Sequence, residues 1–269
     1  MLRSVPVRPG SAGRTAAVPV TAAVWALVGA AVLVQIVYPL VPEGARTPVT
    51  VLSVVVFCAA AVADAARRTG LRGALVLLAV AGGGGLLVEA VGVRTGVPFG
   101  GYDYTGTLGP ELLGVPVVVP LAWTMMAWPA LVVGRTLARS PLGVPLVGGA
   151  ALAAWDVFLD PQMVAAGHWS WDSPDPGLPL VPGVPLTNYA GWVLVGVLMV
   201  GLLHRLLPDG DGPSGPAAAL YLWVYGSSVL AHAAFFGLPG SAVVGAVVMG
   251  LVAVPFAVAL VRGRSGRPR

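Results

Sequence analysis

Two aspartates, Asp156 and Asp160, stand four residues apart in the otherwise apolar stretch AAWDVFLDPQM, residues 153–163. Residues at this spacing share one face of a helix, so their carboxyl groups are expected to lie close together. Two carboxylates in a low dielectric cannot both carry charge cheaply, so one is expected to remain a neutral acid beside a carboxylate. Such a pair suits proton donation to a weak base. The structural alternative is that Asp160 caps a helix end and Asp156 bonds to a neighbouring helix.

Three further polar side chains in apolar stretches are candidates for the same chemistry: Glu89, Asn188 and His232. Ionisable groups inside a membrane span are costly, and they usually face a cavity or a partner. Each also has a simpler interpretation. Glu89 could reach the membrane surface or pair with Arg94, and His232 continues a stripe of tyrosine and serine residues that is typical of interhelical hydrogen bonding.

Aromatic residues are concentrated near the same segments. Their faces can stabilise a cation, although tryptophan and tyrosine also mark the membrane–water interface. Packing is the alternative role for Trp123, and an interfacial belt is the alternative for Trp169 and Trp171. The candidates for substrate binding are Tyr102, Tyr104, Trp123, Trp155, Trp169, Trp171, Tyr189, Trp192 and Tyr225.

The elements that must position these side chains are membrane spans. The 269-residue chain is 57% hydrophobic and only 10% charged, with a mean hydropathy of +0.87, whereas soluble domains are about a quarter charged. Several apolar runs reach the length of about 20 residues that a span requires. We expect an all-α integral membrane protein, a bundle of about eight transmembrane helices with seven as the alternative count. The expected spans are 19–41, 48–66, 71–93, 113–135, 143–163, 186–206, 217–237 and 241–261.

The arginines predict the orientation of these spans. All fifteen basic residues are arginines. If the N-terminus is cytoplasmic, eight spans leave thirteen arginines inside and only Arg46 and Arg94 outside, which is a strong positive-inside bias. We therefore expect a multi-pass protein of the cytoplasmic membrane with both termini inside. Its single transmembrane domain, 19–261, would lie between a cytoplasmic N-terminal tail, 1–18, and a basic cytoplasmic C-terminal tail, 262–269. The apolar stretch that follows the N-terminal tail is expected to be a signal anchor.

This topology brings the candidate polar residues to one depth. Glu89, Asp156, Asp160, Asn188 and His232 all fall near the outer boundary, beside two long outer loops rich in Gly, Pro, Tyr, Trp and Asp. Several costly groups at one level indicate one shared cavity. The sequence contains no Cys/His cluster with zinc spacing, and we expect no metal site.

Three ordered blocks resemble the bacterial and archaeal carotenoid biosynthesis protein family, which contains carotenoid 1,2-hydratases. The first block is VEAVGVRTGVPFGGYDYTGTLGPELLGVPVVVPLAW, the second AAWDVFLDPQM followed by GHWSW, and the third GVPLTNYAGW. The resemblance covers about residues 85–240. It implies a substrate, a long polyene with an isopropylidene end, and a reaction, the addition of water across the terminal C=C to give a tertiary alcohol.

The candidate residues can be matched to that reaction. An alkene is a very weak base, so a neutral carboxylic acid must protonate it, and the water that follows must be held and deprotonated. We expect Asp156 or Asp160 to donate the proton, the other carboxylate or Glu89 to act as base, and Asn188 or His232 to hold the water. No cofactor is expected. The expected partners are the carotenoid substrate, the lipid bilayer and other carotenoid-pathway enzymes, with no nucleic acid.

Three other functions remain as alternatives. The Asp-x-x-x-Asp spacing also fits a membrane prenyltransferase-like enzyme, but a diphosphate needs Mg²⁺ and basic residues, and the nearest outside base is Arg94. A non-enzymatic carotenoid- or lipid-binding membrane protein would also bury aromatic residues around a polyene. A transporter would have its acids spread through the membrane rather than at one level.

Overall fold

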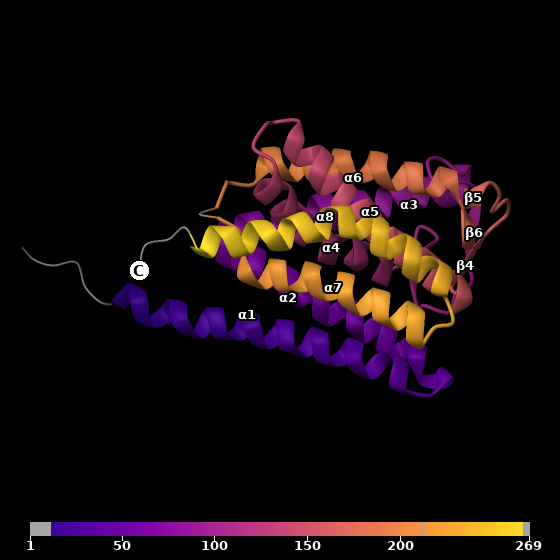
Figure 1. Cartoon of the computed structure of the whole chain (residues 1–269), viewed down its shortest axis with the longest axis horizontal. Helices are drawn as coiled ribbons and strands as arrows, with labels where there is room; N and C mark the ends of the chain where they lie inside the picture. The colour runs from indigo at the N-terminus through magenta and orange to yellow at the C-terminus, as the bar shows by residue number, and fades with distance from the viewer. Residues whose placement is uncertain (1–11, 211, 266–269) are drawn as a thin grey trace, which may run out of the picture.

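The chain forms a bundle of long helices in a computed structural model that describes residues 12–210 and 212–265, with side chains for 20–210 and 212–263 (Figure 1). The expected tails, 1–18 and 262–269, lie mostly outside these residues. Among the described residues, seven helices are long and apolar enough to cross a membrane, in agreement with the predicted all-α bundle. In chain order the helical elements are α1 Ala12–Val37, η1 Tyr38–Leu40, α2 Glu43–Leu77, η2 Leu78–Gly83, α3 Gly84–Thr95, α4 Val118–Leu137, α5 Gly143–Ala165, α6 Leu186–Leu206, α7 Gly215–Ala234 and α8 Pro239–Ser265.

The helical segment Glu43–Thr95 is unusual because it contains 53 residues. At a rise of 1.5 Å per residue, a straight helix of this length would be about 80 Å long, more than twice the thickness of a bilayer core. The segment is broken at Gly70, which has a φ of 76° and a ψ of 175°. Next to the break, the Arg68 guanidinium donates to the Gly212 carbonyl at 2.6 Å. The break therefore lies at the end of the bundle where α6 is linked to α7.

The loops at the other end of the bundle form three small antiparallel sheets, which the sequence did not predict (Figure 1). They pair β1 (Tyr102–Tyr104) with β4 (Trp169–Trp171), β2 (Glu111–Leu112) with β3 (Val115–Pro116), and β5 (Gly177–Leu178) with β6 (Val181–Pro185). In the first sheet Tyr102 lies opposite Trp171, and Tyr104 lies opposite Trp169. This pairing joins the two long loops that the sequence placed outside the membrane.

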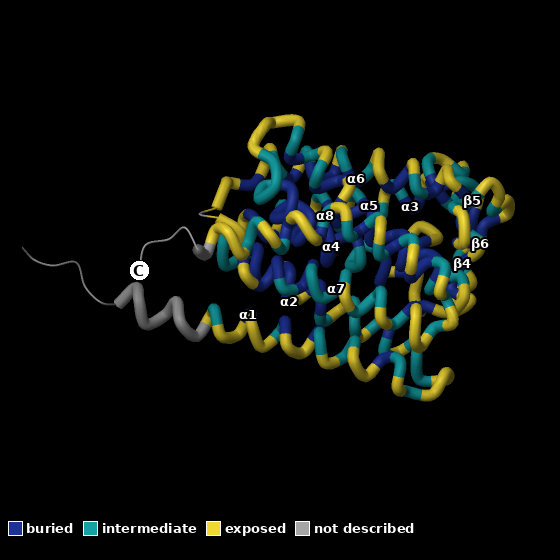
Figure 2. The backbone as a smooth tube through the Cα atoms, viewed as in Figure 1, coloured by how far each residue is buried: buried dark blue, intermediate teal, exposed yellow. Residues whose placement is uncertain are grey.

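Helix α4 forms the centre of the bundle, and every residue from Trp123 to Gly134 is buried (Figure 2). A helix that is apolar on all sides can be buried in this way. Helices α5 and α6 lie close together because glycines replace larger side chains where they meet. A Cβ at Gly149 would lie 2.5 Å from the Val197 nitrogen, and one at Gly196 would lie 2.9 Å from the Gly149 carbonyl oxygen. This close packing aligns the polar residues of α5 with those of α6.

Candidate active site

The two aspartates of α5 lie against Asn188 of α6, and all three side chains are buried. The Asn188 amide nitrogen donates to Asp156 Oδ2 at 2.8 Å and also to Asp160 Oδ2. The Trp169 indole donates to Asp160 Oδ1 at 3.2 Å. One amide that bridges two carboxyl groups holds them side by side, as the four-residue spacing predicts. Because α5 continues beyond Asp160 to Ala165, Asp160 is not a helix cap.

A third carboxyl group, Glu89 of α3, is held by three donors from two other parts of the chain. The hydroxyl groups of Tyr102 and Tyr104 both donate to Oε2, the latter at 2.9 Å, and the Trp123 indole donates to Oε1 at 2.9 Å. Arg94 instead donates to the Ala90 carbonyl at 2.7 Å. Glu89 is therefore a buried hydrogen-bond acceptor and not the surface partner of Arg94.

The two tyrosines that hold Glu89 lie on β1, outside the helices that could cross the membrane. Burial, together with the charge of the Glu89 carboxylate, raises the pKa of Tyr102 and of Tyr104 above the usual value for a phenol. Both phenols therefore remain protonated and act as donors at neutral pH. Their rings contact the tryptophans of β4, with centroids 5.7 Å apart for Tyr102 and Trp171 and 5.6 Å apart for Tyr104 and Trp169.

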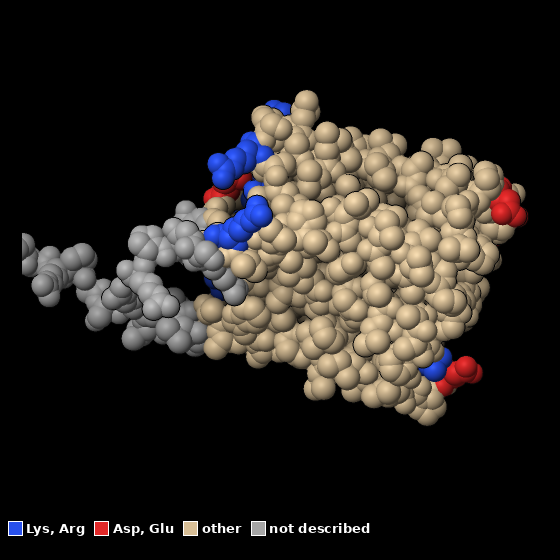
Figure 3. Space-filling model, in the orientation of Figure 1, with Lys and Arg blue, Asp and Glu red and all other residues tan. Residues whose placement is uncertain are grey.

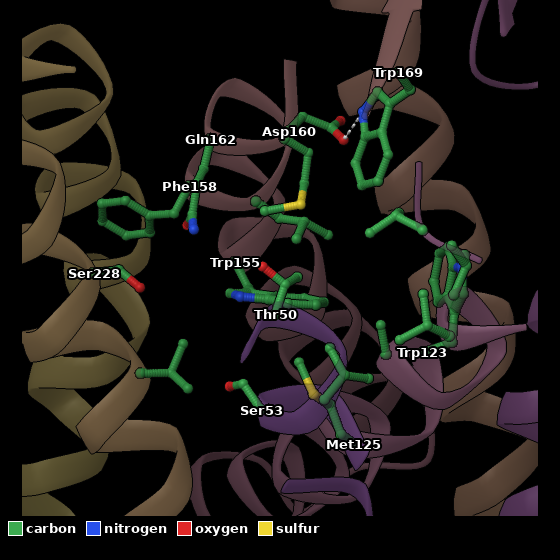
Figure 4. A pocket seen from close by; sticks show the side chains of 18 of the residues that line it. Thr50, Ser53, Trp123, Met125, Trp155, Phe158, Asp160, Gln162, Trp169 and Ser228 are labelled. Carbon is green, nitrogen blue, oxygen red and sulfur yellow. Dashed lines mark hydrogen bonds between the residues drawn. The ribbon is translucent and has the colours of Figure 1, made fainter. Parts of the chain in front are cut away.

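A cavity of about 180 Å³ lies between these carboxyl groups and the neighbouring helices. Figure 4 shows Asp160 and Trp169 at the top of this pocket, Ser228 at its left and Ser53 at its bottom. The stacked rings of Trp123 and Trp192, 4.0 Å apart and 11° from parallel, form part of the wall. The site therefore combines an acidic group with a largely apolar, aromatic surface.

Most of the predicted site residues meet at this cavity. Those that line it are Glu89, Tyr102, Tyr104, Trp123, Trp155, Asp160, Trp169, Trp171, Asn188 and Trp192. These residues come from several elements and share one cavity, while their common depth in the membrane stays a prediction.

Four predicted site residues are absent from the described lining of the cavity: Asp156, Tyr189, Tyr225 and His232. Asp156 does not line the cavity, but Asn188 links it to Asp160, since the Asn188 amide donates to both aspartates. Tyr225 donates to the Ala246 carbonyl at 3.1 Å and so connects α7 with α8. His232 bonds through Nδ1 to the Ser241 hydroxyl at 2.6 Å, which agrees with the interhelical alternative for this residue.

The cavity also has lining residues that the sequence did not single out. Phe99 and Gln162 lie next to predicted residues in the chain, within the first and second of the three sequence blocks. Thr50, Ser53 and Ser228 come from α2 and α7. Serine and threonine in apolar helices commonly bond to their own backbone, as Thr50 does to the Arg46 carbonyl at 3.0 Å. For this reason a serine or threonine in an apolar helix does not by itself predict a binding or catalytic site.

The described residues contain no group of three or more His, Cys, Asp or Glu side chains that could hold a metal ion. The polar side chains that line the cavity carry carboxyl, amide and hydroxyl groups, and they lie among aromatic rings.

Comparison with known proteins gives two kinds of match. The chain is 39% identical over 140 residues to the protein named bisanhydrobacterioruberin hydratase of Haloarcula japonica, an alignment that covers 50% of this chain and 44% of that protein. It is 32% identical over 108 residues to proteins of Mycobacterium bovis and Mycobacterium tuberculosis named 3'-phosphoadenosine 5'-phosphate phosphatase, with 39% of each chain covered. The alignments thus span less than half the length of these relatives. No solved structure is significantly similar to this chain.

The family match is more extensive than these pairwise alignments. The family described as carotenoid biosynthesis protein matches residues 49–252, three quarters of the chain. The matched region contains α3, α4, α5 and α6. It therefore includes the two aspartates, Glu89 and the loops that cover them. The chain therefore belongs to the carotenoid biosynthesis protein family.

Proposed function

We propose that this protein is a hydratase that adds water to the terminal isopropylidene C=C of a linear or monocyclic carotenoid and forms a tertiary alcohol. The observation that carries the proposal is Asp160, a buried carboxyl group that is paired with a second carboxyl group and lines an aromatic cavity. Membership of the carotenoid biosynthesis family and the name of the Haloarcula japonica relative support the same reaction.

In this proposal Asp160 is the proton donor. Its protonated carboxyl group gives a proton to the less substituted carbon of the double bond, and the positive charge develops on the tertiary carbon. Asp160 is favoured over Asp156 because it lines the cavity. Asn188 is a positioning residue, since its amide nitrogen donates to both carboxyl groups and keeps the pair together.

Water then adds to the tertiary carbon, and Glu89 takes the proton that the water loses. Glu89 lines the cavity and is oriented by Tyr102, Tyr104 and Trp123. The faces of the tryptophans in the wall stabilise the cation before the water attacks. One proton enters the substrate and one leaves the water, so the enzyme regains its starting state when the proton on Glu89 has returned to Asp160.

The cavity volume fits an enzyme that acts on the end of a long molecule. Pockets that hold a whole drug-sized ligand measure about 300–1,000 Å³, whereas this cavity measures about 180 Å³. It accommodates the reacting end group, while the apolar polyene body extends among the lipid tails.

We also infer that the chain crosses the cytoplasmic membrane eight times, with both termini on the cytoplasmic side. The break at Gly70 divides Glu43–Thr95 into two crossings. In this topology the break and the α6–α7 link both lie at the arginine-rich cytoplasmic end, and Glu89, Asp156 and Asp160 lie near the outer face. This arrangement satisfies the positive-inside rule.

The prenyltransferase-like alternative is disfavoured by charge. No arginine is among the described residues that line the site cavity, and a diphosphate would find no positive group there. The same argument applies to the phosphate substrates in the names of the mycobacterial relatives. A purely binding role would not require two buried carboxyl groups joined by one amide.

Pigment analysis tests this function. The chain is expressed in a bacterium that makes linear carotenoids, and the extracted pigments are separated and weighed by mass spectrometry. We expect a product heavier than its precursor by one water. An unchanged profile with both a lycopene-type and an elongated polyene, from cells that contain well-inserted protein, would overturn the proposal.

A further inference from the structure

A second cavity, of about 430 Å³, lies at the other end of α4 and α6. Its walls are formed by the end of α4, the end of α6, the α6–α7 link and the part of α2 just before the break at Gly70. Figure 3 shows most of the blue arginine side chains of the visible face gathered at the end of the bundle opposite the strands. The cavity therefore opens where the bundle meets the arginine-rich membrane surface.

The lining of this cavity is strongly basic. Three arginines, Arg68, Arg135 and Arg139, line it together with His204, against the single carboxylate of Asp209. Asp211, in the same link, lies outside the described residues. The nearby Asp64 contributes no free negative charge, because it forms a 2.8 Å ion pair with Arg67 and accepts hydrogen bonds from Trp128 and Ser214.

The three arginines have different roles. Arg135 donates to the carbonyls of Leu207 and Pro208 at 2.7 and 2.9 Å, and it forms an ion pair with Asp209 at 3.2 Å. These contacts stabilise the end of α6. Arg68 makes one hydrogen bond, to the Gly212 carbonyl. No hydrogen bond or ion pair is found for Arg139 within the part of the chain that the structure describes. Arg68 and Arg139 therefore retain guanidinium donors that can face a ligand.

We propose that this cavity binds the phosphate group of an anionic lipid from the cytoplasmic leaflet. Arginine binds phosphate oxygens through two parallel N–H groups, and basic pockets between membrane helices are known sites for lipid head groups. Two exposed leucines flank the cavity in the sequence, Leu142 and Leu206, at 77% and 51% exposure. They would contact the acyl chains of a lipid, which a free phosphate ion does not have.

Membrane topology alone does not account for this arrangement. Arg72 and Arg205 lie at the same end, are exposed and are absent from the lining of the cavity. Such residues satisfy the positive-inside rule without forming a site. They also provide matched controls, because their loss changes the charge of the same end by the same amount. The proposal does not depend on the reaction carried out at the other cavity.

The test compares lipid retention by the full chain and by two double variants, Arg68→Gln with Arg139→Gln and Arg72→Gln with Arg205→Gln. Each protein is purified in detergent and titrated with phosphatidylglycerol, phosphatidylcholine or inorganic phosphate, and bound ligand is followed by native mass spectrometry. We expect the wild type and the control variant to bind phosphatidylglycerol alike. The cavity variant should bind it at least tenfold more weakly, because it lacks both guanidinium groups that would donate charge-assisted hydrogen bonds to the phosphate oxygens.

Each outcome bears on the proposal. If inorganic phosphate displaced phosphatidylglycerol at concentrations similar to those of the lipid, the cavity would be a phosphate site, and the proposal that its ligand is a lipid would be overturned. Equal loss of binding in both double variants, or equal binding of phosphatidylcholine, would overturn the site itself. The single variant Arg139→Gln guards against misfolding, because Arg139 is exposed and holds no other residue in the described structure. Its unchanged affinity for phosphatidylglycerol would also count against the site.

Discussion

Asp156 and Asp160 are one helical turn apart, but their surroundings differ. Asp160 lines the cavity and accepts a hydrogen bond from Trp169. Asp156 does not line the cavity, accepts a hydrogen bond from Asn188, and has one carboxyl oxygen, Oδ1, without a hydrogen-bond partner in the described structure. A group that protonates the substrate must touch it. In our proposal this difference makes Asp160 the acid and Asp156 the group that shares its proton.

Replacement of Asp160 by asparagine should abolish measurable hydration. Asparagine keeps the size and a hydrogen-bonding role but cannot donate an acidic proton, and general acid catalysis contributes about 10²- to 10⁴-fold to a rate. The measurement is the ratio of hydrated to unhydrated carotenoid per inserted protein. The control is Asp103→Asn, which removes an exposed carboxylate on β1. Equal losses in the two variants would contradict the assignment.

At the scale of elements, the loops that cover the site are held together by β1, β4 and the residues beside them. The Thr107 hydroxyl bonds to His168 Nδ1 at 2.7 Å, and the Thr105 amide donates to the His168 carbonyl at 3.0 Å. His168 is buried, and this burial lowers its pKa below the usual value. The folded loop therefore prefers the neutral imidazole.

This preference predicts that the outer loops loosen in acid. As the pH falls below about 6.5, the unfolded loop takes up a proton more readily than the folded one, so the stability present above that pH is lost. The protection factors of the β1 and β4 amides, which are exchange rates corrected for the intrinsic effect of pH on exchange, should be lower at about pH 5.5 than at about pH 7.5. In His168→Asn this difference between the two pH values should be much smaller. An undiminished pH effect in the variant would show that another group is responsible.

The contact between α5 and α6 depends on glycine. Gly149→Ala should destabilise the protein by about 1–3 kcal/mol, because the new methyl group would overlap the backbone of α6 at Val197. Gly226→Ala on α7 is the matched control, since a Cβ there meets nothing within 4 Å. Thermal unfolding in detergent measures both variants. Unfolding temperatures that fall equally in the two would contradict the role of the close approach.

The all-α bundle of apolar helices could be predicted from the sequence, because hydropathy is a local signal. The pairing of β1 with β4 could not, since three-residue strands carry almost no periodicity and their partners are separated by two helices. The hydrogen bonds of Glu89 depend on that pairing, because Tyr102 and Tyr104 lie on β1. The sequence could therefore identify Glu89 as a candidate, but it could not predict the residues that bond to it.

At the scale of the whole molecule, the two cavities give the bundle two chemically different ends. The end covered by the strands holds carboxyl groups and aromatic rings, and the other end holds arginines. In our proposals, the end group of an apolar substrate reacts at the first end, and an anionic lipid binds at the second.

The proposed topology predicts opposite accessibility for two exposed positions. With Cys58 replaced by alanine, an Asp103→Cys variant should react with a membrane-impermeant maleimide in intact cells. An Arg72→Cys variant should react only after the membrane has been opened, because the proposed topology places the break at Gly70 on the cytoplasmic side. Reaction of both variants from the same side would contradict two crossings within Glu43–Thr95.

Acid-catalysed addition of water at Asp160 can be tested with heavy-oxygen water. Membranes that contain the protein are incubated with a linear carotenoid in water labelled with heavy oxygen, and the product is analysed by mass spectrometry. We expect one heavy oxygen in a tertiary hydroxyl group with the wild type and with Asp103→Asn, and no such product with Asp160→Asn at equal protein levels. A product with unlabelled oxygen, or an equal yield from Asp160→Asn, would contradict this mechanism.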